Sequence, residues 1–200
     1  MKVTKTQALE NRAHIVETAS TLFRERGYDG VSVADLMAAA GFTHGGFYKH
    51  FRSKADLMAE AAASGFSQAV ANLAGVDAVA FVNEYLSRKH REALGNGCTL
   101  AALSGDAARQ PELIKKAFAT GIENELATLA RADGDQDESA KHEARAGRID
   151  TLARVVGALV LSRACPDDSA LADEILEVCR TRILSQHDGK EEGPGRANRA

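Results

Sequence analysis

The chain has 200 residues and a formal net charge of −3, with 44% apolar, 26% charged and 5% aromatic residues. These values are typical of a globular protein and exclude a disordered polymer, a collagen-like repeat and a coiled-coil rod. With few sheet-forming aromatics and only 3 prolines against 17 glycines, the chain is predicted to be all-α, and its length allows one domain or two.

The N-terminal part predicts three helices separated by short turns. Apolar residues recur at helical spacing over residues 15–23, and Gly27 provides a stop. Ser32 is an N-cap candidate with Asp35 three residues later, which opens a short helix. Thr43–His50 is a second short helix, and the two have the dimensions of a helix-turn-helix. An ordinary αα-hairpin inside a bundle is the alternative interpretation.

The middle of the chain predicts further helices over residues 77–94 and 98–108, and one that starts at Pro111. Residues 131–147 are charged and nearly free of large apolar side chains. They form either a solvated start of the next helix or a mobile loop.

The C-terminal part contains the most apolar predicted helix, Ile149–Cys165. Its apolar side chains cover several sides, so it must be buried on several sides, in a central or subunit-interface position. A last helix is predicted over Ser169–Ser185. The tail from residue 186 to 200 is polar and Gly-rich, and is predicted to be disordered.

The segment GFTHGGFYKHF from Gly41 to Phe51, followed by Ser53 and Lys54, closely resembles the signature of TetR/AcrR-family regulators. Upstream positions agree with the same family: Ala19, Leu22, Phe23, Gly27, Tyr28, Ser32 and Val33. The match covers about residues 10–60, and the remainder resembles the family only in architecture. The resemblance implies a dimeric, ligand-responsive DNA-binding repressor that is not an enzyme. Its helix-turn-helix head would be residues 1–53, followed by a helical regulatory and dimerisation body over 54–185.

The outward side of the recognition helix must be small or polar to enter a major groove. Thr43 and His44 can bond to base edges, and Gly45 lets the backbone approach closely, although tight helix packing is an alternative reason for the glycines. The resemblance assigns Tyr48 and Lys54 to the phosphate backbone. The expected partner is a palindromic double-stranded DNA operator. The full set of expected DNA contacts is Ser32, Thr43, His44, Gly45, Tyr48, Lys49, His50 and Lys54.

The body is expected to bind an unknown small-molecule effector in an apolar pocket. Periodicity does not separate pocket from core, so the lining residues are candidates only: Phe66, Phe81, Tyr85, Cys98, Leu103, Phe118 and Ile122. Cys98 follows Gly95-Asn96-Gly97 and would lie in the first turn of a helix, where the dipole favours a thiolate. The chain is therefore either a repressor that senses electrophiles or oxidants through Cys98, or one in which Cys98 is a packing residue.

The last two helices are expected to form a homodimer as a four-helix bundle. The expected interface residues are Leu152, Val156, Leu159, Val160, Leu171, Ile175 and Val178.

Other function classes find little support in the sequence. No nucleophile lies in a pattern with a base, so no catalytic residue is assigned. The three cysteines lack metal-ligand spacing, and neither a metal nor a cofactor is expected. No stretch reads as a signal peptide or membrane span, which favours a cytoplasmic protein without a membrane partner. An architectural DNA-binding protein that takes no ligand remains a further alternative.

Overall fold

The computed structural model describes residues 4–130 and 138–191, which form helices and turns without any strand. By their contacts the helices group into two compact units. The first comprises Met1–Ala74 and Ala93–Gly134, and the second comprises Gly75–Glu92 and Asp135–Ala200. The predicted fold class, all-α with an N-terminal helix-turn-helix bundle and a larger helical domain, is confirmed. The functional boundary at residue 53 stays a prediction, since packing does not test it.

The first unit begins with three helical segments: α1 (Lys5–Arg26), α2 (Val33–Ala39) and the 3₁₀ helix η1 (His44–Lys49). Ser32 caps α2 with the predicted capping box, in which its Oγ accepts from the Asp35 amide at 3.1 Å. These segments pack around a core of fully buried side chains. The largest of them are Ile15, Phe23, Tyr28, Leu36 and Phe47.

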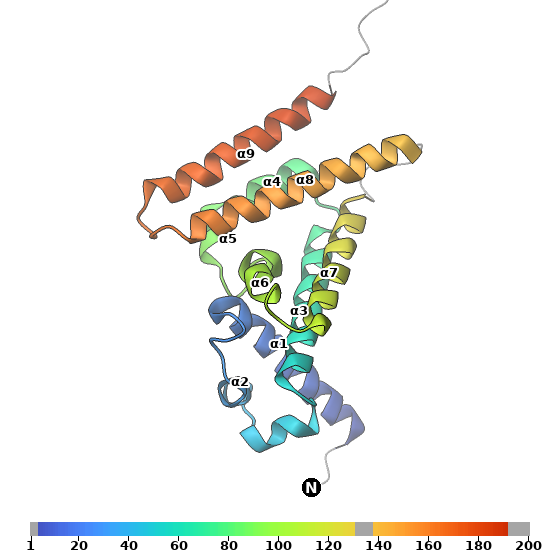
Figure 1. Cartoon of the computed structure of the whole chain (residues 1–200), viewed down its shortest axis with the longest axis vertical. Helices are drawn as coiled ribbons and strands as arrows, with labels where there is room; N and C mark the ends of the chain where they lie inside the picture. Colours follow the sequence, from blue (N-terminus) through green and yellow to red (C-terminus); the bar gives the residue numbers. More distant parts are fainter. Residues whose placement is uncertain (1–3, 131–137, 192–200) are drawn as a thin grey trace, which may run out of the picture. The chain divides into compact units, whose positions relative to one another are not determined.

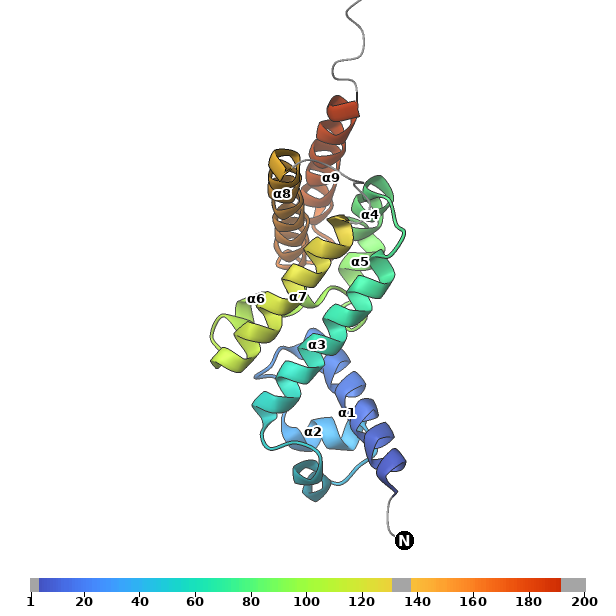
Figure 2. The same ribbon diagram turned by 90° about the vertical axis from the view of Figure 1, so that its right-hand side faces the viewer.

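Three more helices complete this unit: α3 (Lys54–Leu73), α6 (Thr99–Ala107) and α7 (Glu112–Ala130). Ser53 caps α3, with its Oγ accepting a hydrogen bond from the Asp56 amide at 3.1 Å. Helices α3 and α7 lie side by side in both views (Figures 1 and 2). A Cβ on Gly121 of α7 would come within 2.2 Å of the Phe66 ring of α3, so this close approach requires glycine.

The second unit contains α4 (Ala78–Tyr85), α5 (Arg88–Glu92), α8 (Glu138–Arg163) and α9 (Ala170–Glu191). Helices α8 and α9 pack against each other along their length (Figure 1). In the part of the chain that the structure describes, no helix is both long and apolar enough to cross a membrane.

Three predicted boundaries in this unit need correction. The single helix expected over 77–94 is two helices, because the Ser87 hydroxyl donates to the Glu84 carbonyl and accepts from the His90 amide, ending α4 and starting α5. Helix α8 begins at Glu138, before the predicted start at Ile149, so residues 138–147 of the charged segment are a helix start, and residues 131–137 lie outside the described residues. Helix α9 continues to Glu191, beyond the predicted end at Ser185, and the tail after it lies outside the described residues.

Candidate nucleic-acid interface

The recognition segment η1 exposes its polar side and buries its apolar side. Thr43, His44 and Gly45 are exposed, whereas Phe47 is buried and its ring lies 5.5 Å from that of Phe51. The segment is a 3₁₀ helix, not the α-helix expected over Thr43–His50, and the Thr43 side chain makes no capping bond. Two adjacent glycines weaken α-helix propensity, which explains the short 3₁₀ form.

The glycines of η1 are not required by packing. A Cβ on Gly45 would have nothing within 4 Å, and one on Gly46 would make only ordinary contacts, 3.6 Å from the Met37 side chain. Tight helix packing therefore does not explain the glycine at position 45. Because Gly45 has no side chain, another molecule can come close to the backbone on the exposed side of η1.

The remaining DNA-contact candidates differ in solvent exposure and in their bonds to the rest of the chain. Tyr48 is 69% exposed and Lys49 is also exposed, whereas His50 is half-buried. The half-buried Lys54 donates from Nζ to the Tyr28 carbonyl at 2.5 Å and lies 5.9 Å from the Phe23 ring. Lys54 therefore ties the start of α3 to the turn between α1 and α2.

Ser32 is committed to the α2 cap, where its amide and its hydroxyl both donate to the Asp35 carboxylate. These hydrogen bonds lower the pKa of Asp35. Ser32 is exposed and lies next to the helix start whose amides it caps.

Arg12 is a residue of this region that the sequence patterns missed. Its guanidinium donates to the His50 carbonyl and to the Glu60 carboxylate, and lies 4.4 Å from the centre of the Phe51 ring. It thus links α1, the end of η1 and α3. No spacing rule indicates such a role, because its three partners lie 38 or more residues away in the chain.

Two polar contacts bind α1 and the turn after it to the segment around α6. Arg24 donates from Nε to the Gly95 carbonyl at 2.7 Å and from Nη1 to Ser20 Oγ at 2.6 Å. The Asp106 carboxylate of α6 accepts from the Tyr28 amide at 2.9 Å. The position of α6 is therefore fixed against the helix-turn-helix.

Cys98 is the N-cap residue of α6, half-buried, and its side chain makes no capping bond. It lies within electrostatic reach of Arg24: burial lowers the pKa of that guanidinium, while the charges of Cys98 and Glu25 oppose the shift. A helix start and a neighbouring cation both favour a thiolate.

The ligand-pocket candidates fall into both units. Phe66 and Phe118 form an edge-to-face pair at 5.2 Å, in the same unit as Cys98, Leu103 and Ile122. Phe81 and Tyr85 belong to the second unit, where their rings are 5.3 Å apart. A groove of about 520 Å³ runs between α3 and α7, and Phe66 is the one candidate that lines it.

Comparison with known proteins identifies the helix-turn-helix. Residues 15–61, which contain all of α2 and η1, match the family described as bacterial regulatory proteins, tetR family. Residues 15–61 are a TetR-family domain. The resemblance to TetR/AcrR-family regulators is thereby confirmed.

The TetR-family domain is also found in named relatives. The chain is 42% identical over 57 residues to the HTH-type transcriptional regulator AcrR of Shigella flexneri, a stretch that covers 28% of this chain and 26% of AcrR. The chain therefore spans about a quarter of the length of the curated relatives it matches.

Two solved structures extend the likeness beyond the TetR-family domain. The reduced form of E. coli NemR has a TM-score of 0.69 at 18% identity, covering 88% of this chain and 96% of that chain. A TetR transcriptional regulator from Chloroflexus aurantiacus has a TM-score of 0.64 at 26% identity, covering 92% and 96%. The NemR likeness shows the fold alone.

Outside the TetR-family domain, the residues expected at the dimer interface differ in how exposed they are. Leu152 and Leu159 are buried within the chain, because one side of α8 packs in its own unit. Val156 and Ile175 are half-buried. The residues that remain exposed on α8 and α9 include Val160, Leu171 and Val178.

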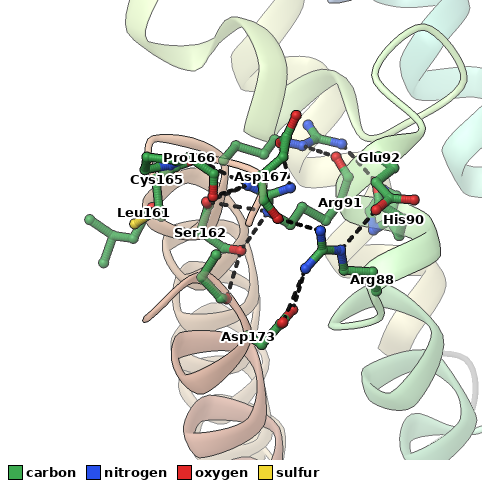
Figure 3. Close-up of polar contacts among 12 residues, drawn as sticks. Arg88, His90, Arg91, Glu92, Leu161, Ser162, Cys165, Pro166, Asp167 and Asp173 are labelled. Carbon is green, nitrogen blue, oxygen red and sulfur yellow. Dashed lines mark hydrogen bonds and ion pairs between the residues drawn. The ribbon is translucent and has the colours of Figure 1, made fainter. Parts of the chain in front are cut away.

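Among the residues that the structure describes outside the TetR-family domain, a polar cluster surrounds Arg91 of α5 (Figure 3). This guanidinium is 3% exposed and donates to Ser162 Oγ at 3.1 Å, to the Cys165 carbonyl at 3.0 Å and to Asp167 at 2.9 Å. In return, Arg163 of α8 donates to the Arg91 carbonyl at 3.0 Å. These contacts cap the end of α8 and hold α5 against it.

Proposed function

We propose that this chain is a sequence-specific transcriptional regulator that binds a palindromic operator as a homodimer and releases it when a small molecule binds. The observation that carries the proposal is the exposed polar side of η1 within a TetR-family domain. There Thr43, His44 and Gly45 face solvent while Phe47 anchors the segment from below.

The side chains around η1 divide by chemistry into base readers and phosphate ligands. Thr43 and His44 offer hydrogen-bonding groups of the kind that read base edges in a major groove. Lys49 and Arg52 are exposed cations close by, suited to phosphate contacts. The net charge of −3 does not oppose DNA binding, because what the DNA meets is the local patch and its copy in a dimer.

The homodimer is supported by the exposed apolar side chains of α8 and α9. Leu171 and Val178 are half or more exposed and lie two turns apart on α9. Apolar residues at this spacing on paired helices suit an isologous contact with a second copy. Two copies would then present two η1 segments to two half-sites about one helical turn apart.

Release by an effector is supported by the bonds between α1 and α6. Arg24 donates to the Gly95 carbonyl, which precedes α6, and the Tyr28 amide donates to Asp106 near the end of α6. A ligand that favours a different position of α6 would also favour a different position of η1. It can weaken DNA binding only by the ratio of its affinities for the two states.

The test measures DNA binding by gel shift, using the DNA upstream of the coding gene and variants of any bound site. Lys49→Ala should weaken binding to all sequences alike and reduce the slope of log affinity against log salt by about 1. His44→Ala should change which sequences bind. Lys115→Ala, an exposed lysine on α7, is the charge-matched control. Weak binding without sequence preference by the unaltered chain would overturn the proposal.

A second candidate function is sensing of electrophiles or oxidants through Cys98. The observation that favours it is the thiol at the N-cap of α6, within electrostatic reach of Arg24, which is itself bonded to Ser20 of α1. Modification there would disturb a contact that reaches the TetR-family domain. After mild quinone treatment, mass spectrometry should show an adduct on Cys98, and the gel shift should show loss of operator binding. Cys98→Ser should show neither effect. An unmodified Cys98 would contradict it.

A further inference from the structure

The recognition segment η1 depends on other helices for its orientation. The amides of His50 and Phe51 both donate to the Phe47 carbonyl, at 2.9 and 3.0 Å, and close its last turn. Two adjacent glycines weaken the segment, and at its start the Thr43 side chain makes no capping bond. A helical segment this short has little stability of its own, so its orientation is set by contacts with its neighbours.

Arg12 of α1 connects the end of η1 to α3. Its guanidinium donates through Nη1 to the His50 carbonyl and through Nη2 to the Glu60 carboxylate. The same group lies 4.4 Å from the centre of the Phe51 ring, close enough for a cation–π contact. A guanidinium can make both bonds at once because its donors form a rigid fork. One side chain therefore fixes the end of η1 against two helices.

A cleft beside Arg12 leaves this side of the η1 turn without close packing. It has a volume of about 370 Å³, and the residues that line it include Arg12, His50, Phe51 and Glu60. Side-chain packing alone does not hold the end of η1 where the cleft adjoins it. The hydrogen bonds of Arg12 supply the restraint that close packing would otherwise give.

The charge of Arg12 is neutralised within the chain. Its side chain is 33% exposed and forms an ion pair with Glu60. A phosphate ligand instead uses its charge to release counterions from DNA. Lys49 and Arg52 are exposed and suit that role. The contacts of Arg12 suit an indirect role, exerted through η1.

We infer that Arg12 is a positioning residue that sets the angle at which η1 presents Thr43 and His44 to base edges. This inference rests on the proposed function, because it concerns how the proposed DNA contacts discriminate between sequences. Readout of this kind requires side chains held to within about 0.5 Å, whereas phosphate contacts carry no sequence information. Loss of Arg12 therefore weakens binding to the operator more than binding to unrelated DNA.

The test compares operator and unrelated DNA in gel shifts at several salt concentrations. Arg12→Met should lower the preference for the operator at least about tenfold, because misplaced side chains lose base contacts. The slope of log affinity against log salt should stay as in the unaltered chain, since no phosphate contact is removed. A preserved preference with a slope reduced by about 1 would make Arg12 a phosphate ligand and overturn the inference.

The matched control is Arg26→Met, which removes the same charge from an exposed position of the same helix. It should retain the preference for the operator. Circular dichroism checks that each variant is folded at the temperature of the gel shift.

Two conservative variants keep the inference falsifiable if Arg12→Met fails to fold. Arg12→Lys keeps the charge but loses the fork that reaches His50 and Glu60 together, so the preference for the operator should still fall. Glu60→Gln keeps an oxygen acceptor but loses the ion pair, and it should cause a smaller fall. Unchanged preference in either variant would overturn the inference.

A measurement without DNA separates this inference from the proposed function. In Arg12→Lys, deuterium uptake at the His50 and Phe51 amides should rise, because the turn that they close loses its restraint. Uptake at the Phe23 amide, in the buried part of α1, should not change. A chain that binds no operator contradicts the proposed function, while raised uptake in Arg12→Lys still supports the positioning role. A chain that binds its operator but shows unchanged uptake and preference in Arg12→Lys contradicts the inference alone.

Discussion

The guanidinium of Arg91 in α5 donates to the backbone carbonyl of Cys165, just beyond the end of α8, at 3.0 Å. It also bonds to the Ser162 hydroxyl, which in turn donates to the Ala172 carbonyl of α9 at 2.8 Å. One buried side chain therefore joins three helices, and its removal would leave buried carbonyls unsatisfied.

Arg91→Met is expected to lower the free energy of unfolding by at least about 2 kcal/mol, since it removes several hydrogen bonds from a buried site. For a chain of this length the melting temperature should fall by about 4–8 °C. Arg88→Met is the control: its ion pairs with Asp173 and Glu92 are exposed to solvent, so its loss should change the melting temperature much less. Calorimetric melting of both variants compares them, and equal losses would contradict the assigned role of Arg91.

Gly45→Ala separates stability from DNA binding. The added methyl group meets nothing within 4 Å, and alanine favours helical backbone, so stability should stay the same or rise by up to about 1 kcal/mol. Operator affinity should fall, because the methyl group stands on the side of η1 proposed to approach DNA. Melting and gel shift on one preparation test this. Unchanged affinity would remove Gly45 from the DNA contacts.

A glycine-to-alanine substitution on α7 should have the opposite effect on stability. Gly121→Ala places a methyl group 2.2 Å from the Phe66 ring, so it should destabilise the chain by about 1–3 kcal/mol. A melting temperature equal to that of the unaltered chain would contradict the close packing of α3 on α7.

Glu125 should make stability depend on pH. Burial raises its pKa to about 7, so between the unfolded value near 4.5 and about 7 the folded chain holds a proton that the unfolded chain has lost. The contribution of this group to stability therefore falls as pH rises through this interval, by about 3 kcal/mol in all. Denaturant titrations should show Glu125→Gln gaining stability over the unaltered chain at pH 8 but not at pH 4.5. A parallel pH dependence of the two would contradict this.

Val178→Glu tests the proposed dimer. The side chain is 51% exposed in the single chain, so a charge there leaves the fold intact but must be buried on association. Light scattering at micromolar concentration should show a dimer for the unaltered chain and a monomer for the variant. Glu174→Gln, an exposed change on the same helix, should remain dimeric.

Local chemistry made much of the fold predictable from sequence. Ser32 with Asp35, and Ser53 with Asp56, cap helices through contacts only three residues apart, and both caps are present. The apolar spacing of α1 likewise predicted its buried side. The 3₁₀ form of η1 was not predicted, although its cause, two adjacent glycines, is visible in the sequence.

Long-range contacts account for what the sequence did not predict. Arg12 and Arg91 look like surface charges in the sequence, because their partners lie 38 or more residues away. The burial of Glu125 depends on which helices surround α7, which no local pattern encodes. Leu152 and Leu159 were expected at a dimer interface since α8 is apolar on several sides, and periodicity alone does not say which side stays within the chain.

The hydrogen bond from the Tyr28 amide to Asp106 gives the chain an internal reporter. A backbone proton held in this way exchanges with solvent only when α6 moves away from the turn that follows α1. Its deuterium uptake would therefore register an effector at the moment it displaces α6, whether or not DNA is present. One amide thus separates a compound that changes the protein from one that only competes for the operator.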